Sequence, residues 1–287
     1  MFTIKSKEEI DILREGGEIL ADIMEAVLDK VKPGVETGEL EDLACEMMEK
    51  RGGRPAFKGY EIFQDGFFPT ALCISINEEI VHGPAYPSRK IKEGDILSID
   101  CGMEYPVAIE RKAGELIYSI QKQERTSPIN KYSLHGGYYT DMARTVAAGK
   151  IGKDTRKLMN TTRECLEKAI ARIKPGNTLN DIGKAIQEHA ESRNFSVVRE
   201  LVGHRVGHDV HEDPKIFNYE ISPYGFEDMA LKPGMVVAIE PMVNMGQYKI
   251  KVAEDNFTIV TADNSLSAHF EDTIAITENG AEVITRK

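Results

Sequence analysis

The sequence of 287 residues is poor in the features that mark a disulfide-bonded or membrane protein. It has no tryptophan and only four cysteines, Cys45, Cys73, Cys101 and Cys165, which show no C-x-x-C spacing. Cysteines this sparse do not make a disulfide framework, so we expect reduced thiols. No uncharged run approaches the roughly 18 apolar residues of a membrane span. Charges interrupt the opening MFTIKSKEEIDIL, where a signal peptide needs an apolar stretch, so we expect a cytoplasmic protein.

Positive charge is also in short supply. The chain has 36 Lys+Arg against 47 Asp+Glu, a net charge of −11, which is the opposite of the usual nucleic-acid-binding footprint. Hydrophobic residues make up 41% and charged residues 29%, a composition too apolar for disorder and ordinary for a globular protein. We therefore expect a folded protein that binds neither DNA nor a membrane.

Several catalytic motifs are missing as well. The sequence contains no Gly-x-Ser-x-Gly nucleophile elbow, no Walker A loop, no Gly-x-Gly-x-x-Gly and no His-Glu-x-x-His. These absences argue against the enzyme classes that depend on them, including the helical zinc peptidases.

Two helices are predicted near the start of the chain. Ser6-x-x-Glu9 has the pattern of a capping box, and it precedes an amphipathic stretch with apolar residues at helical spacing. Lys32-Pro33-Gly34 ends that helix, because proline cannot continue it and glycine accepts a positive φ. Thr37 opens a second helix with its own apolar stripe, and strands are predicted over residues 71–76 and 95–100.

The second half of the chain repeats this order. A helix over about residues 154–173 ends at a second Lys-Pro-Gly turn, and another helix follows. Pro33 and Pro175 lie 142 positions apart, and the strand ends Asp100 and Glu240 lie 140 apart. Two matches at nearly one offset favour an internal duplication over coincidence. We expect one domain over 1–287 with α/β halves at about 1–150 and 151–287.

Carboxylates end or interrupt the apolar strands of both halves. Asp100 and Glu240 follow such strands, while Asp141 and Glu271 lie in two further strand-like segments. An unpaired buried carboxylate costs several kcal/mol, so each of these acids must be solvated, ion-paired or bound to a cation. Packing of the halves around a two-fold axis would bring the four together.

Histidines complete a candidate metal site. His204, His208 and His211 fall within eight residues, and His82 follows a predicted strand. Oxygen ligands with an imidazole suit Mn²⁺, Co²⁺, Fe²⁺ or Zn²⁺. Five ligands, four of them carboxylates, can hold two such ions about 3.5–4 Å apart and balance their charge. This set is typical of a dinuclear hydrolytic centre.

At these residues the sequence resembles the type I methionine aminopeptidases, the bacterial kind without an N-terminal extension. The match runs over nearly the whole chain and includes PAFKGY at 55–60, CISINE at 73–78, His82-Gly83, HEDP at 211–214 and EPMVN at 240–244. The motifs are specific when taken together in this order. The resemblance implies the duplicated "pita-bread" α/β fold, an antiparallel sheet covered by helices, with a dinuclear metal site at its centre.

The resemblance also implies which residues hold the two divalent ions. His204 and Glu240 would bind one ion, Asp100 would bind the other, and Asp141 and Glu271 would bridge both. The ions would activate a water for attack on the peptide carbonyl.

Substrate-contacting roles follow from the same resemblance. His211 would donate a hydrogen bond to the carbonyl oxygen, His82 would contact the scissile amide, and Glu240 would shuttle the proton. The apolar pocket for the methionine side chain would involve Phe68, Cys73, Met242 and Phe257. The substrate would be the N-terminus of a nascent polypeptide with a small second residue, and the enzyme a monomer with transient ribosome association.

The sequence departs from the family pattern beside these residues. Arg205 replaces the usual glycine, where it would shape the cleft or pair with an acid, and Phe257 falls where many members carry tryptophan. His208 is an extra imidazole, either a third-site ligand or a surface residue. His269 and Asp272 flank Glu271 where glutamine and histidine are commoner.

An extra segment separates the two metal-binding aspartates. Asp100 and Asp141 lie 41 positions apart, about four times the usual gap, so we expect an insertion over about 103–132. A surface insertion is the favoured interpretation, because lengthening a loop costs little. A partner contact or a lid is the alternative, and the insertion suggests a streptococcal-like subgroup.

Two other functions stay open at this point. A prolidase or aminopeptidase P shares the five ligands, although little chain precedes Asp100 for the extra domain that those enzymes carry. A pita-bread protein that has lost its chemistry and binds peptides or RNA is the second, against which the intact ligand set and the net charge of −11 speak.

Overall fold

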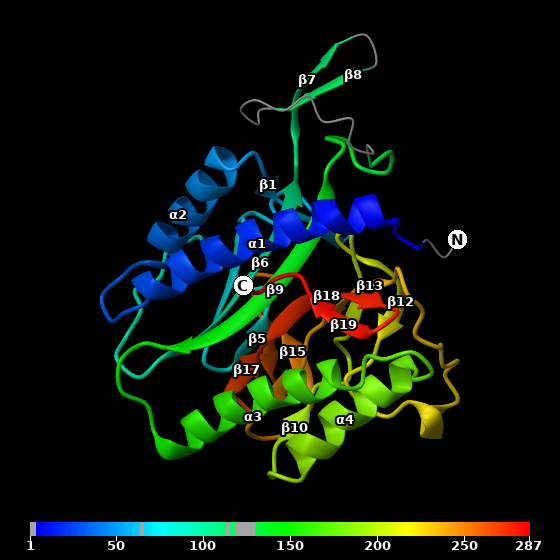
Figure 1. Ribbon diagram of the computed structural model, residues 1–287. Helices are drawn as coiled ribbons and strands as arrows, with labels where there is room; N and C mark the ends of the chain where they lie inside the picture. The colour runs from blue at the N-terminus through cyan, green and yellow to red at the C-terminus, as the bar shows by residue number, and fades with distance from the viewer. Residues whose placement is uncertain (1–3, 64–65, 113–114, 119–129) are drawn as a thin grey trace.

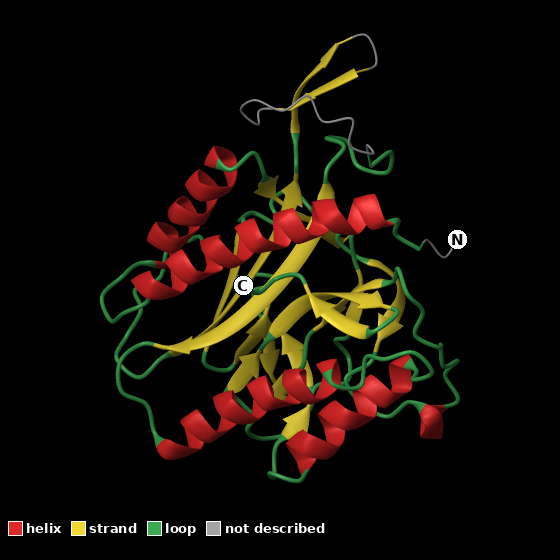
Figure 2. Cartoon of the chain, viewed as in Figure 1, coloured by secondary structure: helices red, strands yellow, loops and turns green. Residues whose placement is uncertain are grey.

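A computed structural model describes residues 4–63, 66–112, 115–118 and 130–287 (Figure 1). The described α-helices are α1 (Lys7–Lys30), α2 (Thr37–Lys50), α3 (Lys153–Ile170) and α4 (Leu179–Glu191), with one 3₁₀ turn, η1 (Ser222–Tyr224). Figure 2 shows the helices gathered on one side of a curved sheet. None of the described helices is long and apolar enough to cross a membrane.

A nine-stranded antiparallel sheet forms the centre of the molecule. Its order is β1-β6-β9-β18-β13-β11-β12, with β4 also paired to β6 and β19 to β18. These strands are β1 (Arg54–Pro55), β4 (Leu72–Ile76), β6 (Ile96–Tyr105), β9 (Tyr138–Ala147), β11 (Gly203–Arg205), β12 (Glu212–Ile216), β13 (Val236–Ile239), β18 (Glu271–Thr277) and β19 (Gly280–Val283). Because β9 and β18 are neighbours, both halves of the chain share one sheet, which supports a single catalytic unit.

Smaller sheets surround the central one. A three-stranded sheet joins β10 (Ser196–Val197), β14 (Met242–Asn244) and β17 (Ser267–His269). Another joins β15 (Ile250–Val252), β16 (Ile259–Thr261) and β5 (Glu79–Val81), and the hairpin pairs are β2 (Glu61–Phe63) with β3 (Gly66–Phe67) and β7 (Ala108–Lys112) with β8 (Glu115–Tyr118). Strand β5 thus brings the first half onto a sheet of the second.

Both predicted helix starts and the internal repeat are present. The Ser6 side chain accepts from the Glu9 N–H while the Glu9 carboxylate accepts from the Ser6 N–H, which is the predicted capping box. The isolated bridges Glu36↔Lys90 and Thr178↔Ala230 repeat one contact at offsets of 142 and 140 positions. The strand order β6-β9-β18-β13 is correspondingly symmetric about the β9–β18 pair. The predicted duplication is therefore a structural one.

Each half has its own apolar core between helices and sheet. In the first half, Leu20 and Met24 of α1 and Leu40 of α2 are buried with Leu72 and Ile99 of the sheet. The second core packs α3 and α4 against β13 and β18 and includes Leu158, Leu166, Ile182, Ile186, Val237 and Ile274. The apolar stripes read from the sequence thus face the sheet.

The end of strand β6 lies within the segment expected to be inserted. Strand β6 continues through Met103, which pairs with Thr140 of β9 and with Pro55 of β1. The expected insertion of about 103–132 therefore overlaps the end of β6, which stays paired to β1 as far as Glu104 and to β9 as far as Tyr105. The β7–β8 hairpin that follows projects from the body of the molecule (Figure 1), and residues 113–114 and 119–129 of the expected insertion lie outside the described residues.

Candidate metal centre and substrate cavity

Four adjacent strands bring the predicted carboxylates together. Asp100 lies on β6, Asp141 on β9 and Glu271 at the start of β18, and Glu240 directly follows β13. Asp100, Asp141 and Glu271 are 8% exposed or less. Thr273 fixes β18 against β9 at this level, because its Oγ1 accepts from the Asp141 N–H at 2.8 Å and donates to the Asp141 carbonyl at 2.7 Å. The halves therefore meet at the acids, as the duplication predicted.

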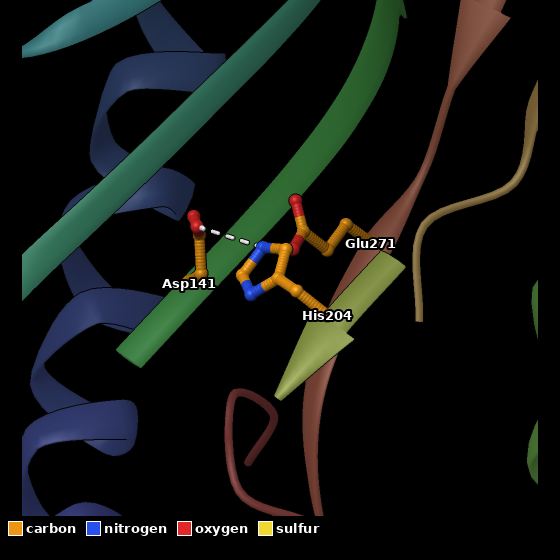
Figure 3. Close-up of side chains that lie close together, drawn as sticks. All are labelled: Asp141, His204 and Glu271. Carbon is orange, nitrogen blue, oxygen red and sulfur yellow. Dashed lines mark ion pairs between the residues drawn. The ribbon is translucent and has the colours of Figure 1, made fainter. Parts of the chain in front are cut away.

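His204 enters the cluster from β11 with a defined ring orientation. Its Nδ1 lies 3.0 Å from the Arg205 carbonyl oxygen, an acceptor that assigns the hydrogen to Nδ1. The Nε2 lone pair then faces the carboxylates, 3.6 Å from Glu240 Oε1 and 4.0 Å from Asp141 Oδ2. Figure 3 shows Asp141, His204 and Glu271 converging from three strands. A histidine whose Nδ1–H is hydrogen-bonded to a carbonyl while its Nε2 faces carboxylates is oriented to bind a metal ion through Nε2.

The acid cluster lacks its own positive partner. Burial, followed by the neighbouring acids, raises the pKa values of Asp100, Glu240 and Glu271 well above their usual range, and burial raises the pKa of Asp141 to about 7. Within the described part of the chain, no lysine or arginine makes an ion pair with any of the four carboxylates. When these buried carboxylates are ionised, bound cations are needed to balance their negative charge.

The donor set fits divalent metal ions. Asp100 Oδ1, Asp141 Oδ1 and Glu271 Oε1 are buried, and none of them has a hydrogen-bond partner among the described residues. Asp141, His204 and Glu271 offer ligand atoms within 4.8 Å of one another, and so do Glu240, His269 and Glu271. Carboxylate oxygens with imidazole suit Mn²⁺, Co²⁺, Fe²⁺ or Zn²⁺. All five predicted ligands line one cavity. His269 lies beside Glu240 and Glu271.

The stability of the metal-free protein is expected to fall as pH rises from about 4 to 7. An acid with a raised folded-state pKa binds its proton more tightly when folded, so its ionisation opposes folding above the unfolded-state pKa. For Asp141, that window runs from the ordinary value of 3.8 to about 7. Thermal unfolding in EDTA at pH 5 and pH 8 measures the loss. The same scans with Mn²⁺ are the control, and an equal decline with and without the ion would contradict the prediction.

An apolar cavity of about 350 Å³ opens above the acid cluster. Phe68, Cys73 and Met242 line it, as expected for three of the four predicted pocket residues. Further lining residues are Phe57, Tyr60, Glu61, Val81, Glu200, Leu201 and Val202. Phe57 and Tyr60 lie in the PAFKGY motif, which is the sequence signal that could have indicated them.

Phe257 is the predicted pocket residue that does not line the cavity. Its ring packs edge-on against Phe68, with centroids 5.9 Å apart and an interplanar angle of 82°. Phe257 therefore contacts the cavity wall through Phe68.

Both predicted substrate-binding histidines, His82 and His211, line the cavity. His82 follows β5 and holds φ at +60°, an uncommon conformation for a residue other than glycine. Burial, with a smaller contribution from His211, lowers the pKa of His82 to about 4, so its ring is neutral at pH 7. The His211 ring meets the His204 ring edge-on at 4.5 Å and the Tyr60 ring at 5.1 Å. Neutral imidazoles so placed can donate hydrogen bonds to a bound peptide.

The two unusual residues near His204, Arg205 and His208, contact carboxylates other than the four of the cluster. Arg205 is 2% exposed, and its guanidinium lies 3.5 Å from Glu212 and donates to the Asp213 carbonyl. His208 Nε2 lies 2.8 Å from Glu9 Oε1 of α1. Arg205 thus pairs with an acid, one of the two expected roles, and the His208 ring contacts Glu9 of α1.

A buried ion pair fastens the N-terminal segment to the loop that carries His211. Lys5 is 2% exposed, and its Nζ lies 2.6 and 2.7 Å from the two carboxylate oxygens of Glu212. Glu212 also accepts the His208 N–H at 2.7 Å. The loop therefore rests on Lys5 at one end and on the contact of His208 with α1 at the other.

Lys5→Met is expected to lower the free energy of unfolding by about 3 kcal/mol, because it removes the closer of the two cations beside the buried Glu212 carboxylate and leaves Arg205 at 3.5 Å. Urea unfolding measures the loss, with the exposed Lys7→Met as the matched control. Lys5→Met combined with Glu212→Gln should recover part of the loss. A Lys5→Met protein as stable as the Lys7→Met protein would show that the pair contributes nothing.

Fold and site together define a metallopeptidase. The sequence model of Metallopeptidase family M24 matches residues 11–109 and 131–278, so the chain belongs to that family. Residues 110–130 fall outside the match, within the segment expected to be inserted.

Relatives that match over the whole chain narrow the assignment within family M24. Methionine aminopeptidase 1 of Bacillus subtilis (strain 168) is 42% identical over 287 residues, with all of both chains covered. The crystal structure of methionine aminopeptidase from Thermotoga maritima matches with a TM-score of 0.83 at 39% identity, covering 100% of both chains. A streptococcal methionine aminopeptidase structure matches with a TM-score of 0.84 at 34% identity, covering 100% of this chain and 98% of that one. Within family M24, the chain is a methionine aminopeptidase, a metal-dependent exopeptidase with the pita-bread fold.

Proposed function

We propose that the protein is a dinuclear type I methionine aminopeptidase that removes the N-terminal methionine from nascent polypeptides with a small second residue. The convergence of five ligand side chains from both halves, at the base of an apolar cavity, carries this proposal. His204 and Glu240 would hold one divalent ion, Asp100 the other, and Asp141 and Glu271 both. When bound, the ions supply Lewis-acid polarisation of the peptide carbonyl and activation of water; whether they are Mn²⁺, Co²⁺, Fe²⁺ or Zn²⁺ depends on supply as well as on ligands.

The histidines would orient the peptide bond. His211 would donate a hydrogen bond to the carbonyl oxygen, which stabilises the negative charge that develops there. His82 would contact the scissile amide nitrogen, and Glu240 would carry the proton to the leaving amine. The lowered pKa of His82 keeps its ring neutral, and a neutral imidazole has one N–H donor and one nitrogen acceptor. This supports the proposed contact of His82 with the amide nitrogen.

The cavity wall would select the first side chain. Phe68, Cys73 and Met242, with Phe57 and Tyr60 beside them, offer apolar and aromatic surface to a thioether. Sulfur packs favourably against aromatic rings, by about 0.3–1.5 kcal/mol per contact. A methionine side chain fits this environment better than a charged one, because burying an unpaired charge there would be costly.

We further propose the cellular setting and the subgroup. All five proposed ligands come from one chain, which supports a monomer. A nascent-chain substrate would call for a cytoplasmic enzyme with transient access to the ribosome. The unmatched residues 110–130 and the likeness to the streptococcal structure support the subgroup with an insertion between Asp100 and Asp141.

Two peptides test the function. Met-Ala-Ser and Ala-Pro peptides are assayed with Mn²⁺ or Co²⁺, before and after EDTA, and the purified protein is analysed for metal. We expect cleavage of Met-Ala-Ser alone, lost in EDTA and restored by the ion. Cleavage of the X-Pro peptide alone would identify a prolidase or aminopeptidase P instead, and cleavage of neither would favour a peptide-binding protein without activity.

A further inference from the structure

His269 is a buried histidine whose role the proposed mechanism leaves open. It ends β17 and is 1% exposed, and neither ring nitrogen has a hydrogen-bond partner within the described residues. Its Nε2 lies 3.7 Å from Glu240 Oε2 and 3.8 Å from Glu271 Oε2. A buried polar group without a partner costs about 1–3 kcal/mol, so a retained one calls for a function.

The backbone of His269 is held on both sides. Its N–H donates to Thr145 Oγ1 at 2.9 Å, and the Thr145 hydroxyl donates to the His269 carbonyl at 2.7 Å. Thr145 lies on β9, and β17 is also paired with β14 through Met242↔His269. Rigid strands therefore aim the ring at the carboxylates.

The two oxygens of Glu240 face different imidazoles. Oε1 lies 3.6 Å from His204 Nε2, whereas Oε2 lies 3.7 Å from His269 Nε2. A cation shared by His204 and Glu240 would use Oε1, which leaves Oε2 toward His269. A shift of less than about 1 Å would bring His269 and Oε2 to hydrogen-bond distance.

The hydrogen bonds of the two histidines distinguish their roles. A histidine that binds a metal ion usually donates its other ring N–H to an acceptor, as His204 Nδ1 does to the Arg205 carbonyl. His269 Nδ1 has no such acceptor in the described structure, so a metal-binding tautomer would leave its N–H buried and unpaired. With the hydrogen on Nε2, that N–H instead faces the carboxylates, with Glu240 Oε2 at 3.7 Å and Glu271 Oε2 at 3.8 Å.

We propose that His269 is a positioning residue of the metal centre, whose Nε2–H donates to Glu240 Oε2 and so directs Oε1 of Glu240 at the cation. This rests on the proposed function, since it takes Glu240 as a metal ligand. Residues that orient ligands in this way contribute about 10–100-fold to metal affinity or activity.

The test compares three variants of the full-length protein by titration of the metal-free form with Mn²⁺, together with the visible absorption spectrum of the Co²⁺ form. His269→Leu removes the donor, His269→Gln keeps an N–H donor, and His189→Leu is the matched control on α4, where the ring pairs with Glu164. We expect His269→Leu to weaken Mn²⁺ binding about 10–100-fold. His269→Gln should bind Mn²⁺ within about threefold of the wild type and keep its Co²⁺ spectrum, since the amide replaces the N–H donor.

Either of two outcomes would overturn the proposal. Wild-type affinity in His269→Leu would remove His269 from the metal centre. A His269→Gln protein as weak as His269→Leu, with an altered Co²⁺ spectrum, would make His269 a ligand. Failure of the wild type itself to bind Mn²⁺ would instead refute the proposed function. Should His269→Leu not fold, the Gln variant still decides between donor and ligand, because it retains a polar side chain of similar reach.

Discussion

Asp100→Asn is expected to abolish peptide cleavage and to lower the bound metal together. The substitution keeps the shape of the side chain but removes one of four charges that balance two divalent ions. We expect kcat to fall by at least about 10³-fold, which corresponds to roughly 4 kcal/mol of transition-state stabilisation. Metal analysis and the Met-Ala-Ser assay on the same preparation measure both effects, with the exposed Asp154→Asn as the matched control.

The same substitution should stabilise the protein once the metal has been removed. Asp100 is buried against Asp141 and Glu240, whose charges oppose its ionisation. In EDTA, Asp100→Asn should therefore unfold at a higher temperature than the wild type, whereas with Mn²⁺ the order should reverse. A variant with full activity and unchanged metal content would refute the assignment of Asp100 as a ligand.

His82→Ala is expected to lower kcat by about 10²–10⁴-fold while both metal ions stay bound. The ring lies in the cavity and does not belong to the acid cluster, so its loss should affect proton handling at the scissile amide more than metal affinity. Steady-state kinetics with Met-Ala-Ser and metal analysis separate the two.

A second variant controls for the unusual backbone at this position. His82 has φ at +60°. Adopting this backbone conformation costs free energy for alanine but not for glycine. His82→Gly should therefore lose as much activity as His82→Ala if the imidazole matters. Recovery of activity in the glycine variant would assign the loss to backbone strain, and wild-type kinetics in both would remove His82 from the mechanism.

The sequence could predict those parts of the site that depend on local pattern and on the repeat. The spacing of Asp100 and Glu240 from the two Lys-Pro-Gly turns indicated two equivalent strands, and the structure places these strands on either side of the β9–β18 pair. The capping box at Ser6 was readable because its two hydrogen bonds span only three residues.

Contacts between distant segments could not be predicted in the same way. Lys5 and Glu212 are 207 positions apart, and nothing in either local sequence indicates the partner. Leu201 and Phe68 line the same cavity although they lie far apart in the sequence, and the Phe257 ring packs against Phe68 from a third segment. The sequence showed His269 to be unusual. Its proposed role depends on the structure, in which one Glu240 oxygen faces His204 and the other faces His269.

The β9–β18 junction also bears on the origin of the molecule. Asp100 and Asp141 come from one repeat and Glu240 and Glu271 from the other, so a homodimer of a single ancestral repeat would already have presented two pairs of acids across its dyad. Such an ancestor could have bound its cations only when dimerised, which would have tied ion binding to association from the outset. Fusion of two such copies would free each half to diverge, and in this structure His204 joins the four carboxylates from the second half.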